Sequence, residues 1–439
     1  MEQGSSSFRR QLAQELEHWR AEGLVSPDQA ERLRERYGLG ALAQESRGAL
    51  LTAVYVIGAL LVAGGVISFV AAHWDQMPRA VKVAVIFAAM LGAHGAGWWF
   101  WRVRASHPRL GHGLVFLGTL IFGANIGLMA QIFHIRSDFY NGFGAWALGA
   151  LLMAYAAASL PNLLVAILAS FIWFCGWTYD HRAAVSFYPV LAAALFLPFA
   201  WWRRSAAAFA ATALTAGTAW VVAAGMQGNS PAPCLLAMTG FGGLLFGFGM
   251  WALESPRSRL FAPTALALGV MALVGATYVF SFHEMARESL RERLWRAPDP
   301  IWMVPVGALY AAMVLAWAGG LGVALRRRDL RPLAAAALLA VLLPAVGLAA
   351  RMDTLLTFFV NAAAVVLAAA LILTGVTQLR RGLFWAGVLY ALLLVITRFL
   401  EYDTGLMLKS AAFLLCGLAV IYGGVQFENR LRARRPGHE

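Results

Sequence analysis

Residues 354–376 read TLLTFFVNAAAVVLAAALILTGV, without one charged side chain. A helix needs about 20 apolar residues to cross the hydrocarbon core of a bilayer, so this stretch is long enough to span a membrane. The composition of the whole chain is similarly apolar: 60% of its residues are hydrophobic and 13% are charged. That charged share is about half of what soluble globular proteins carry. The composition therefore predicts an all-α, polytopic α-helical membrane protein.

Apolar stretches of this kind recur from residue 47 onward and are separated by short polar turns. They predict about 14 transmembrane helices within a transmembrane domain over residues 47–425. The expected spans are 49–72, 80–101, 110–132, 142–159, 162–178, 184–201, 205–225, 232–253, 260–281, 301–325, 332–350, 354–376, 382–399 and 404–424. A basic cytoplasmic tail follows at residues 426–439.

Residues 1–46 are polar and charged, which argues against a cleavable signal peptide. They predict a small cytoplasmic helical hairpin. Its first helix ends at Gly23, and Ser26 is placed to cap a second helix that has Pro27 at its first position. The three cysteines, Cys175, Cys234 and Cys416, are scattered and give no disulfide or metal spacing.

The net charge of +13 comes mostly from arginines in the turns between apolar stretches. Such placement indicates orientation in a membrane rather than nucleic-acid binding. Every second turn is rich in arginine and poor in acids, which predicts that both termini are cytoplasmic. Basic and acidic residues are equal in number in the alternate, outer turns, as expected for ion-paired networks near the membrane surface. The one long outer turn predicts an amphipathic surface helix at about 284–297.

Polar residues in the apolar helices are candidate binding residues. The stretch 123–146, GANIGLMAQIFHIRSDFYNGFGAW, holds five of them: Asn125, Gln131, His134, Arg136 and Asp138. On a continuous helix, Gly127, Gln131, His134 and Asp138 share one face, and Asp138 is placed to accept a hydrogen bond from His134. A structural network between helices is the alternative to a binding site, because polar groups in lipid need partners.

Other outer helix ends supply further candidates for the same network. Asn361 lies near the middle of its span, and Lys409 lies close enough to the surface to extend toward it. If the fold gathers these ends, they form a charged pocket that suits phosphate or carboxylate groups. The remaining candidates are Arg351, Asp353, Arg398 and Glu401.

Enzyme motifs are weak in this chain. No HExxH, P-loop, CxxC or convincing GxSxG pattern occurs, which disfavours an enzyme and predicts neither a metal nor a cofactor.

Four stretches together resemble a bacterial family of predicted membrane proteins, domain of unknown function 2157. They are EHWRAEGLVSPDQAERL (17–33), GGVISFVAAHWDQMPRAVK (64–82), GANIGLMAQIFHIRSD (123–138) and TRFLEYDTGLMLKSAAFLLCGLAVIYGG (397–424). The resemblance implies a location in the bacterial cytoplasmic membrane. It implies no established activity and no catalytic residues.

Three functions remain open on the sequence. The first is a transporter-like or flippase-like protein that handles an anionic or lipid-linked solute, with membrane lipids around it and His134 as a residue that could couple proton movement. The second is an outer-face membrane enzyme acting on a lipid-linked substrate, with Asp138 or His134 as the base. The third is a non-catalytic scaffold or sensor that signals through the N-terminal hairpin.

Overall fold

A computed structural model describes residues 6–37, 68, 72–181, 187–227, 230–291, 300–401 and 405–433. All regular elements in these ranges are helices, so the predicted all-α class is confirmed. The chain divides into two compact units, Met1–Val85 and Ile86–Glu439.

The N-terminal unit contains helices α1 (Ser6–Ala21) and α2 (Pro27–Tyr37). They pack on each other through Leu16 and Ala30, both almost fully buried. The predicted cap is present: Ser26 Oγ accepts from the backbone N–H of Gln29 at 3.3 Å, and Gln29 Oε1 accepts from that of Ser26 at 3.0 Å. This reciprocal pair satisfies two N–H groups that the helix start leaves free.

Helix α4 (Arg79–Trp98), which follows the short helix η1 (Trp74–Gln76), leads into the second unit and ends in a π-helical turn, η2 (Trp99–Val103). The helices after it have these bounds: α5 Pro108–Ile132, α6 Phe139–Ala156, α7 Leu160–His181, α8 Tyr188–Trp202, α9 Ala206–Gln227, α10 Ala232–Ala252, α11 Ala262–Val279, α12 His283–Leu290, α13 Pro300–Arg326, α14 Arg331–Ala350, α15 Asp353–Thr377, α16 Arg381–Glu401 and α17 Leu406–Ala433.

Each predicted span from the second onward coincides with one of these helices. Within the described residues, 10 helices are long and apolar enough to cross a membrane. Two further apolar helical stretches are shorter: Tyr188–Trp202, which is α8, and Ala311–Arg326 within α13. The first expected span, 49–72, lies almost wholly outside the described residues. The count of 14 therefore stays a prediction.

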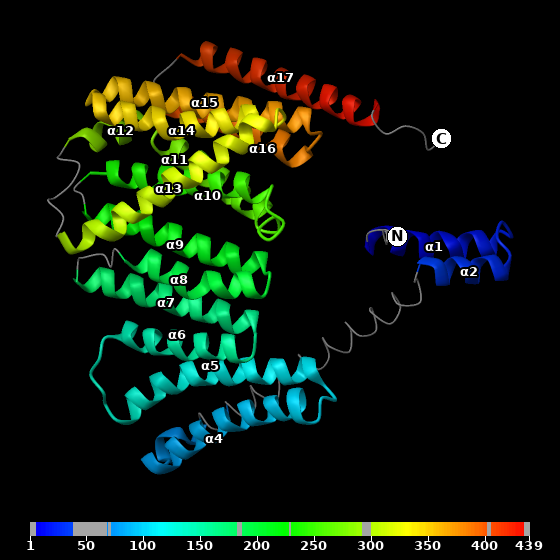
Figure 1. Ribbon diagram of the computed structural model, residues 1–439, viewed down its shortest axis with the longest axis vertical. Coiled ribbons are helices and arrows are strands. Elements are labelled where there is room, and N and C mark those ends of the chain that lie inside the picture. Colours follow the sequence, from blue (N-terminus) through cyan, green and yellow to red (C-terminus); the bar gives the residue numbers. More distant parts are fainter. Residues whose placement is uncertain are drawn as a thin grey trace. The chain divides into compact units, whose positions relative to one another are not determined.

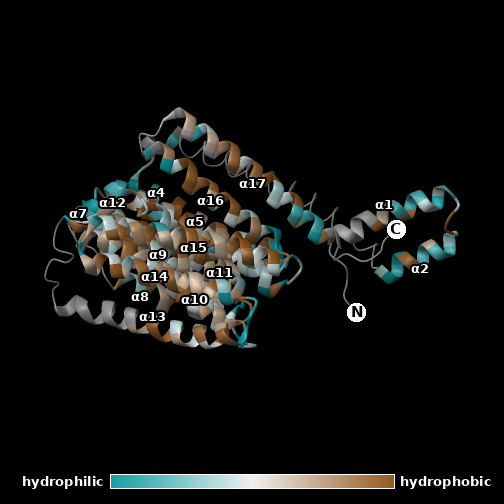
Figure 2. Cartoon of the chain, turned by 90° about the horizontal axis from the view of Figure 1, so that it is seen from above, coloured by the Kyte–Doolittle hydropathy of each residue, from teal (hydrophilic) through white to brown (hydrophobic). Residues whose placement is uncertain are grey.

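Helices of the second unit pack mainly on their neighbours in sequence, as α6 does on α7 and α14 on α15. Figure 1 shows them side by side, with the α5–α6 connection at one end of the helices and the α10–α11 connection at the other. In Figure 2 hydrophobic residues fill the middle of these helices, while hydrophilic residues gather toward the ends. This distribution is the one a membrane-spanning bundle requires.

Helix α10 is in contact with four helices, α9, α11, α13 and α14. Its glycines permit the close approach that the sequence GFGGLLFGFG suggests. A β-carbon added to Gly247 would lie 2.6 Å from the carbonyl oxygen of Ala316 in α13, and one added to Gly320 would lie 2.8 Å from the Cα of Gly247. The backbones of α10 and α13 thus meet where only glycine fits.

Several helices end in a left-handed residue other than glycine. His134, Ala158, Arg204 and Leu379 have φ between 49° and 53°. In each case the next backbone N–H bonds to a carbonyl five residues earlier, as Ser159 does to Ala154 at 2.9 Å and Ser205 to Ala200 at 2.9 Å. These are Schellman motifs, which satisfy carbonyls that the last helical turn leaves free.

Helix α12 is the described part of the predicted surface helix. Its predicted apolar face, including Ala286 and Leu290, packs with Leu356 and Val360 of α15. This face is therefore covered by protein and not by the membrane surface. Residues 292–299, which the prediction also includes, lie outside the described ranges.

Candidate functional site

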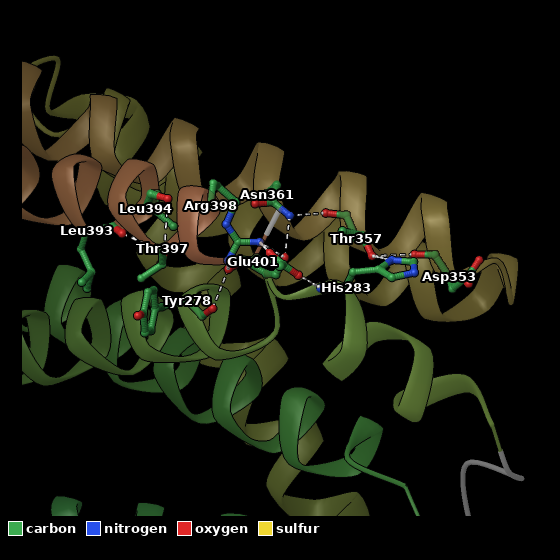
Figure 3. Close-up of polar contacts among 11 residues, drawn as sticks. Tyr278, His283, Asp353, Thr357, Asn361, Leu393, Leu394, Thr397, Arg398 and Glu401 are labelled. Carbon is green, nitrogen blue, oxygen red and sulfur yellow. Dashed lines mark hydrogen bonds and ion pairs between the residues drawn. The ribbon is translucent and has the colours of Figure 1, made fainter. Parts of the chain in front are cut away.

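Six polar residues meet near the ends of α11, α12, α15 and α16, and we call them the polar cluster (Figure 3). Arg398 and Glu401 come from the last turn of α16, and Thr357 and Asn361 from α15. The short segment that joins α11 to α12 supplies Ser281, and His283 opens α12.

Arg398 lies at the centre of the polar cluster. Its Nη1 atom donates to the carboxylate of Glu401 and, at 2.9 Å, to the carbonyl oxygen of Ser281. Its Nη2 atom donates to Ser281 Oγ at 3.1 Å, and its guanidinium lies 4.4 Å from the ring centre of Phe282. Only 21% of the Arg398 side chain and 16% of the Glu401 side chain is exposed. Removing two charges this far from solvent is costly unless they are paired as they are here.

Glu401 also binds the start of α12. One carboxylate oxygen accepts from the backbone N–H of His283 at 2.6 Å. The first N–H groups of a helix have no partner within the helix and carry a partial positive charge. Glu401 therefore neutralises Arg398 and caps α12 at the same time.

Asn361 ties α15 to the same backbone segment. Its Nδ2 atom donates to the carbonyl oxygens of Ser281 and Thr357, both at 2.8 Å. Thr357 Oγ1 donates to the carbonyl oxygen of Asp353 at 2.8 Å and lies 3.4 Å from His283 Nδ1. The Ser281 carbonyl, just beyond the end of α11, thus accepts from two helices.

One polar atom of the polar cluster has no partner within the described residues. Arg398 Nε is buried and makes no hydrogen bond there. A buried N–H without an acceptor costs about 1–3 kcal/mol. The Nε donor of the guanidinium is therefore left for an additional acceptor.

The structure brings together three of the candidates: Asn361, Arg398 and Glu401. Asp353 is linked to them only through its backbone carbonyl, and its carboxylate accepts from the Thr354 N–H at 2.8 Å. Arg351 ends α14 with φ of 52° and is exposed, and Lys409 lies on α17. Within the described residues, no ion pair or hydrogen bond joins these two to the polar cluster.

The α5–α6 connection differs from its prediction. Helix α5 ends at Ile132 and His134 adopts φ of 50°, so Gln131, His134 and Asp138 do not share a helix face. Asp138 accepts from Tyr140 Oη at 2.9 Å and not from His134. The predicted span does end at residue 132, but the shared face was continued beyond it because no glycine or proline marks the turn.

All four candidate residues at this connection are exposed: Gln131, His134, Arg136 and Asp138. Asn125 is different: it is 6% exposed, and its Nδ2 donates to the carbonyl oxygen of Ile86 in α4 at 3.0 Å. It anchors two helices, which is the structural role weighed for it from the sequence.

Sequence reasoning missed Ser281, His283 and Thr357. Serine and threonine are common in membrane helices, and the Ser281 backbone carbonyl carries no side-chain signal at all. Two spacings do point to the polar cluster: Thr357 and Asn361 are four residues apart, and Arg398 and Glu401 are three apart, so each pair lies on one helix face. In the described part of the chain no group of three metal-binding side chains occurs.

Comparison with known proteins adds one match. Residues 17–163 match the family model described as Predicted membrane protein (DUF2157). No curated protein and no solved structure matches the chain. The polar cluster lies outside the matched residues, whereas the α5–α6 connection lies within them. The match confirms the resemblance seen in the sequence, and with the apolar helices it identifies the chain as an integral membrane protein with a DUF2157 region at residues 17–163.

Proposed function

We propose that this membrane protein is transporter-like or flippase-like, and that it moves an anionic or lipid-linked solute across the bacterial cytoplasmic membrane with both termini in the cytoplasm. The single observation that carries the proposal is Arg398, largely shielded from solvent, paired with Glu401 and hydrogen-bonded to the α11–α12 segment. Ionisable residues placed inside membrane proteins are expensive to keep there and commonly mark solute pathways.

The proposed mechanism is an exchange of carboxylate for solute at Arg398. An anionic group of the solute takes the place of Glu401 and uses the free Nε donor, which the Glu401 contact leaves idle. Arginine suits this role because its planar guanidinium binds carboxylates and phosphates through two parallel hydrogen bonds.

Release of Glu401 would also free the start of α12. The carboxylate holds the His283 N–H, so its departure removes the cap of that helix. Solute binding is thereby coupled to a movement of α12 against α15, the helix on which it packs. A ligand shifts a conformational equilibrium only through such a difference in contacts between two states.

A proteoliposome assay tests the proposal. The purified full chain is reconstituted, and transfer of tail-labelled fluorescent phosphatidylglycerol is followed by dithionite quenching, with efflux of radiolabelled phosphate as the soluble probe. We expect vesicles that contain the protein to show faster lipid transfer or faster phosphate efflux than protein-free vesicles. Arg398→Gln should abolish the acceleration, and Glu401→Gln should change it.

The matched control lies on the same helix. Arg381 of α16 pairs with Glu428 of α17 at 2.6 Å, but 62% of its side chain is exposed. Arg381→Gln should leave transfer unchanged. Vesicles with the intact protein that move neither probe faster than empty ones would contradict the proposal, as would equal losses in the Arg398 and Arg381 variants.

A further inference from the structure

A cavity of about 620 Å³ lies at the opposite end of the helices from the polar cluster. The start of α5 and the α6–α7 and α8–α9 turns line it, and its polar side chains are those of His112, Ser159, Arg203, Arg204 and Ser205. Both turns are the Schellman motifs described above, at Ala158 and Arg204.

The charge around this cavity is uncompensated. Neither Arg203 nor Arg204 forms an ion pair within the described ranges. At the same end of the bundle, by contrast, Arg326 pairs with Glu254 at 3.6 Å and Arg381 pairs with Glu428. Helices α7 and α9 also begin at the cavity, and each N-terminus adds a partial positive charge. The cavity is therefore suited to an anion.

Aromatic residues place the cavity at the level of lipid head groups. Trp201 and Trp202 are 45% and 58% exposed, and the Arg203 guanidinium lies 5.9 Å from the ring centre of Trp202. On the other side of the cavity the Trp101 ring lies 4.5 Å from that of His112. Exposed tryptophans of membrane proteins concentrate at the membrane–water interface.

A second cavity, of about 350 Å³, extends from the first turns of α6 and α8, at Asn141 and Tyr188, to the middle of these helices. It lies among α6, α7 and α8, and its lining is mostly apolar, including Leu148, Leu151 and Leu195. Phe196 lines this cavity and Phe199 lines the first, three residues apart on one side of α8. A charged site is thus followed by an apolar one, which matches a phosphate group attached to a hydrocarbon chain.

We propose that the two cavities together bind an anionic phospholipid, with its phosphate at Arg203 and Arg204 and an acyl chain against α6 and α8. Arginine pairs bind phosphate through charge-assisted hydrogen bonds, and the apolar cavity accounts for a lipid over free phosphate. This site is independent of the function proposed above, because a lipid held here need not be moved.

Binding of tail-labelled fluorescent phosphatidylglycerol to the purified full chain in detergent, followed by anisotropy, tests the charged half. Arg203→Gln/Arg204→Gln should weaken binding roughly tenfold or more. The control, Arg257→Gln/Arg259→Gln, removes the same charge from the α10–α11 connection, outside the cavity, and should stay within about twofold. Equal weakening in both double variants, or none in the first, would overturn the site.

The apolar half has its own test, on an exposed residue whose change leaves the bundle intact. Ala145 lines the second cavity, so Ala145→Phe should weaken lipid binding several-fold, whereas Ala156→Phe on the same helix should not.

Displacement of the labelled lipid by glycerol phosphate distinguishes a lipid head group from a free phosphate compound as the ligand. We expect it to compete far more weakly than unlabelled phosphatidylglycerol. Competition as strong as the lipid's, together with no effect of Ala145→Phe, would overturn the lipid assignment.

Discussion

The polar cluster and the α5–α6 connection look alike in sequence but differ in structure. Both place charged and amide side chains at the ends of apolar helices. In the polar cluster, residues from separate helices converge on one carbonyl, that of Ser281, and become partly buried. In the connection, residues from one continuous segment spread over a turn and stay exposed.

The difference shows that helix packing, and not polarity, creates a buried site. Helices α11, α15 and α16 lie against one another, so their ends share the same small volume. Gln131 lies in the last turn of α5, and His134 and Arg136 follow it in the connection, so their side chains diverge along one segment. Substitutions in the two regions should therefore differ in their cost to stability.

Replacing Arg398 with methionine should cost about 3 kcal/mol of unfolding free energy, because Glu401 then keeps a buried charge without its partner. Denaturant titration in mixed micelles measures the loss. The double variant Arg398→Met/Glu401→Leu should recover part of it. A loss no larger than that of Arg381→Met would show that the ion pair of the polar cluster is effectively exposed.

The two asparagines give a direct comparison between the regions. Asn361→Leu loses two hydrogen bonds and should cost about 1.5 kcal/mol, whereas Asn125→Leu loses one and should cost about 0.6 kcal/mol. The same titration compares them. A reversed order would mean that the Asn125 contact with Ile86, and not the polar cluster, is the stronger link between helices.

His134→Gly should stabilise the protein by roughly 0.5–1 kcal/mol, since glycine adopts the left-handed conformation without strain. Ala158→Gly is the control at an equivalent turn and should shift the melting temperature in the same direction. If only the His134 variant is destabilised, the imidazole makes a contact that its exposed position does not suggest.

Gln131→Ala and Arg136→Ala should change the unfolding free energy by less than about 0.5 kcal/mol, because both side chains are exposed. Thermal unfolding of the two variants beside the intact protein is sufficient. A loss close to that of Arg398→Met would place this connection in a buried site of its own.

Much of the fold follows from the sequence, because apolar length and polar turns determine where membrane helices begin and end. The span predicted at 354–376 is observed as Asp353–Thr377, and that predicted at 232–253 as Ala232–Ala252. The end of α5 was predicted at residue 132 and is observed at Ile132, but the turn after it was not predicted, since a histidine and not a glycine takes the left-handed position. A Schellman motif without glycine cannot be recognised from the residue types in the sequence.

The candidate site could be predicted only in part. Asn361, Arg398 and Glu401 stand out because polar groups in lipid need partners. Which partners they find depends on how α11, α15 and α16 pack, and the central acceptor is a backbone carbonyl that any residue would supply. Arg351 and Lys409 are also basic residues near the ends of apolar helices, as Arg398 is. Within the described residues, however, no hydrogen bond or ion pair joins them to the polar cluster.

The packing of helices on their neighbours in sequence has a consequence for synthesis. Pairs such as α6 with α7, α8 with α9 and α14 with α15 can each bury their common face soon after the second helix leaves the ribosome. The contact of α10 with α13 is one of the exceptions, because α11 and α12 emerge between them. The glycine face of α10 around Gly247 therefore stays without its packing partner for longer than the faces buried in those neighbouring pairs. During that time it is open to non-native contacts with other helices.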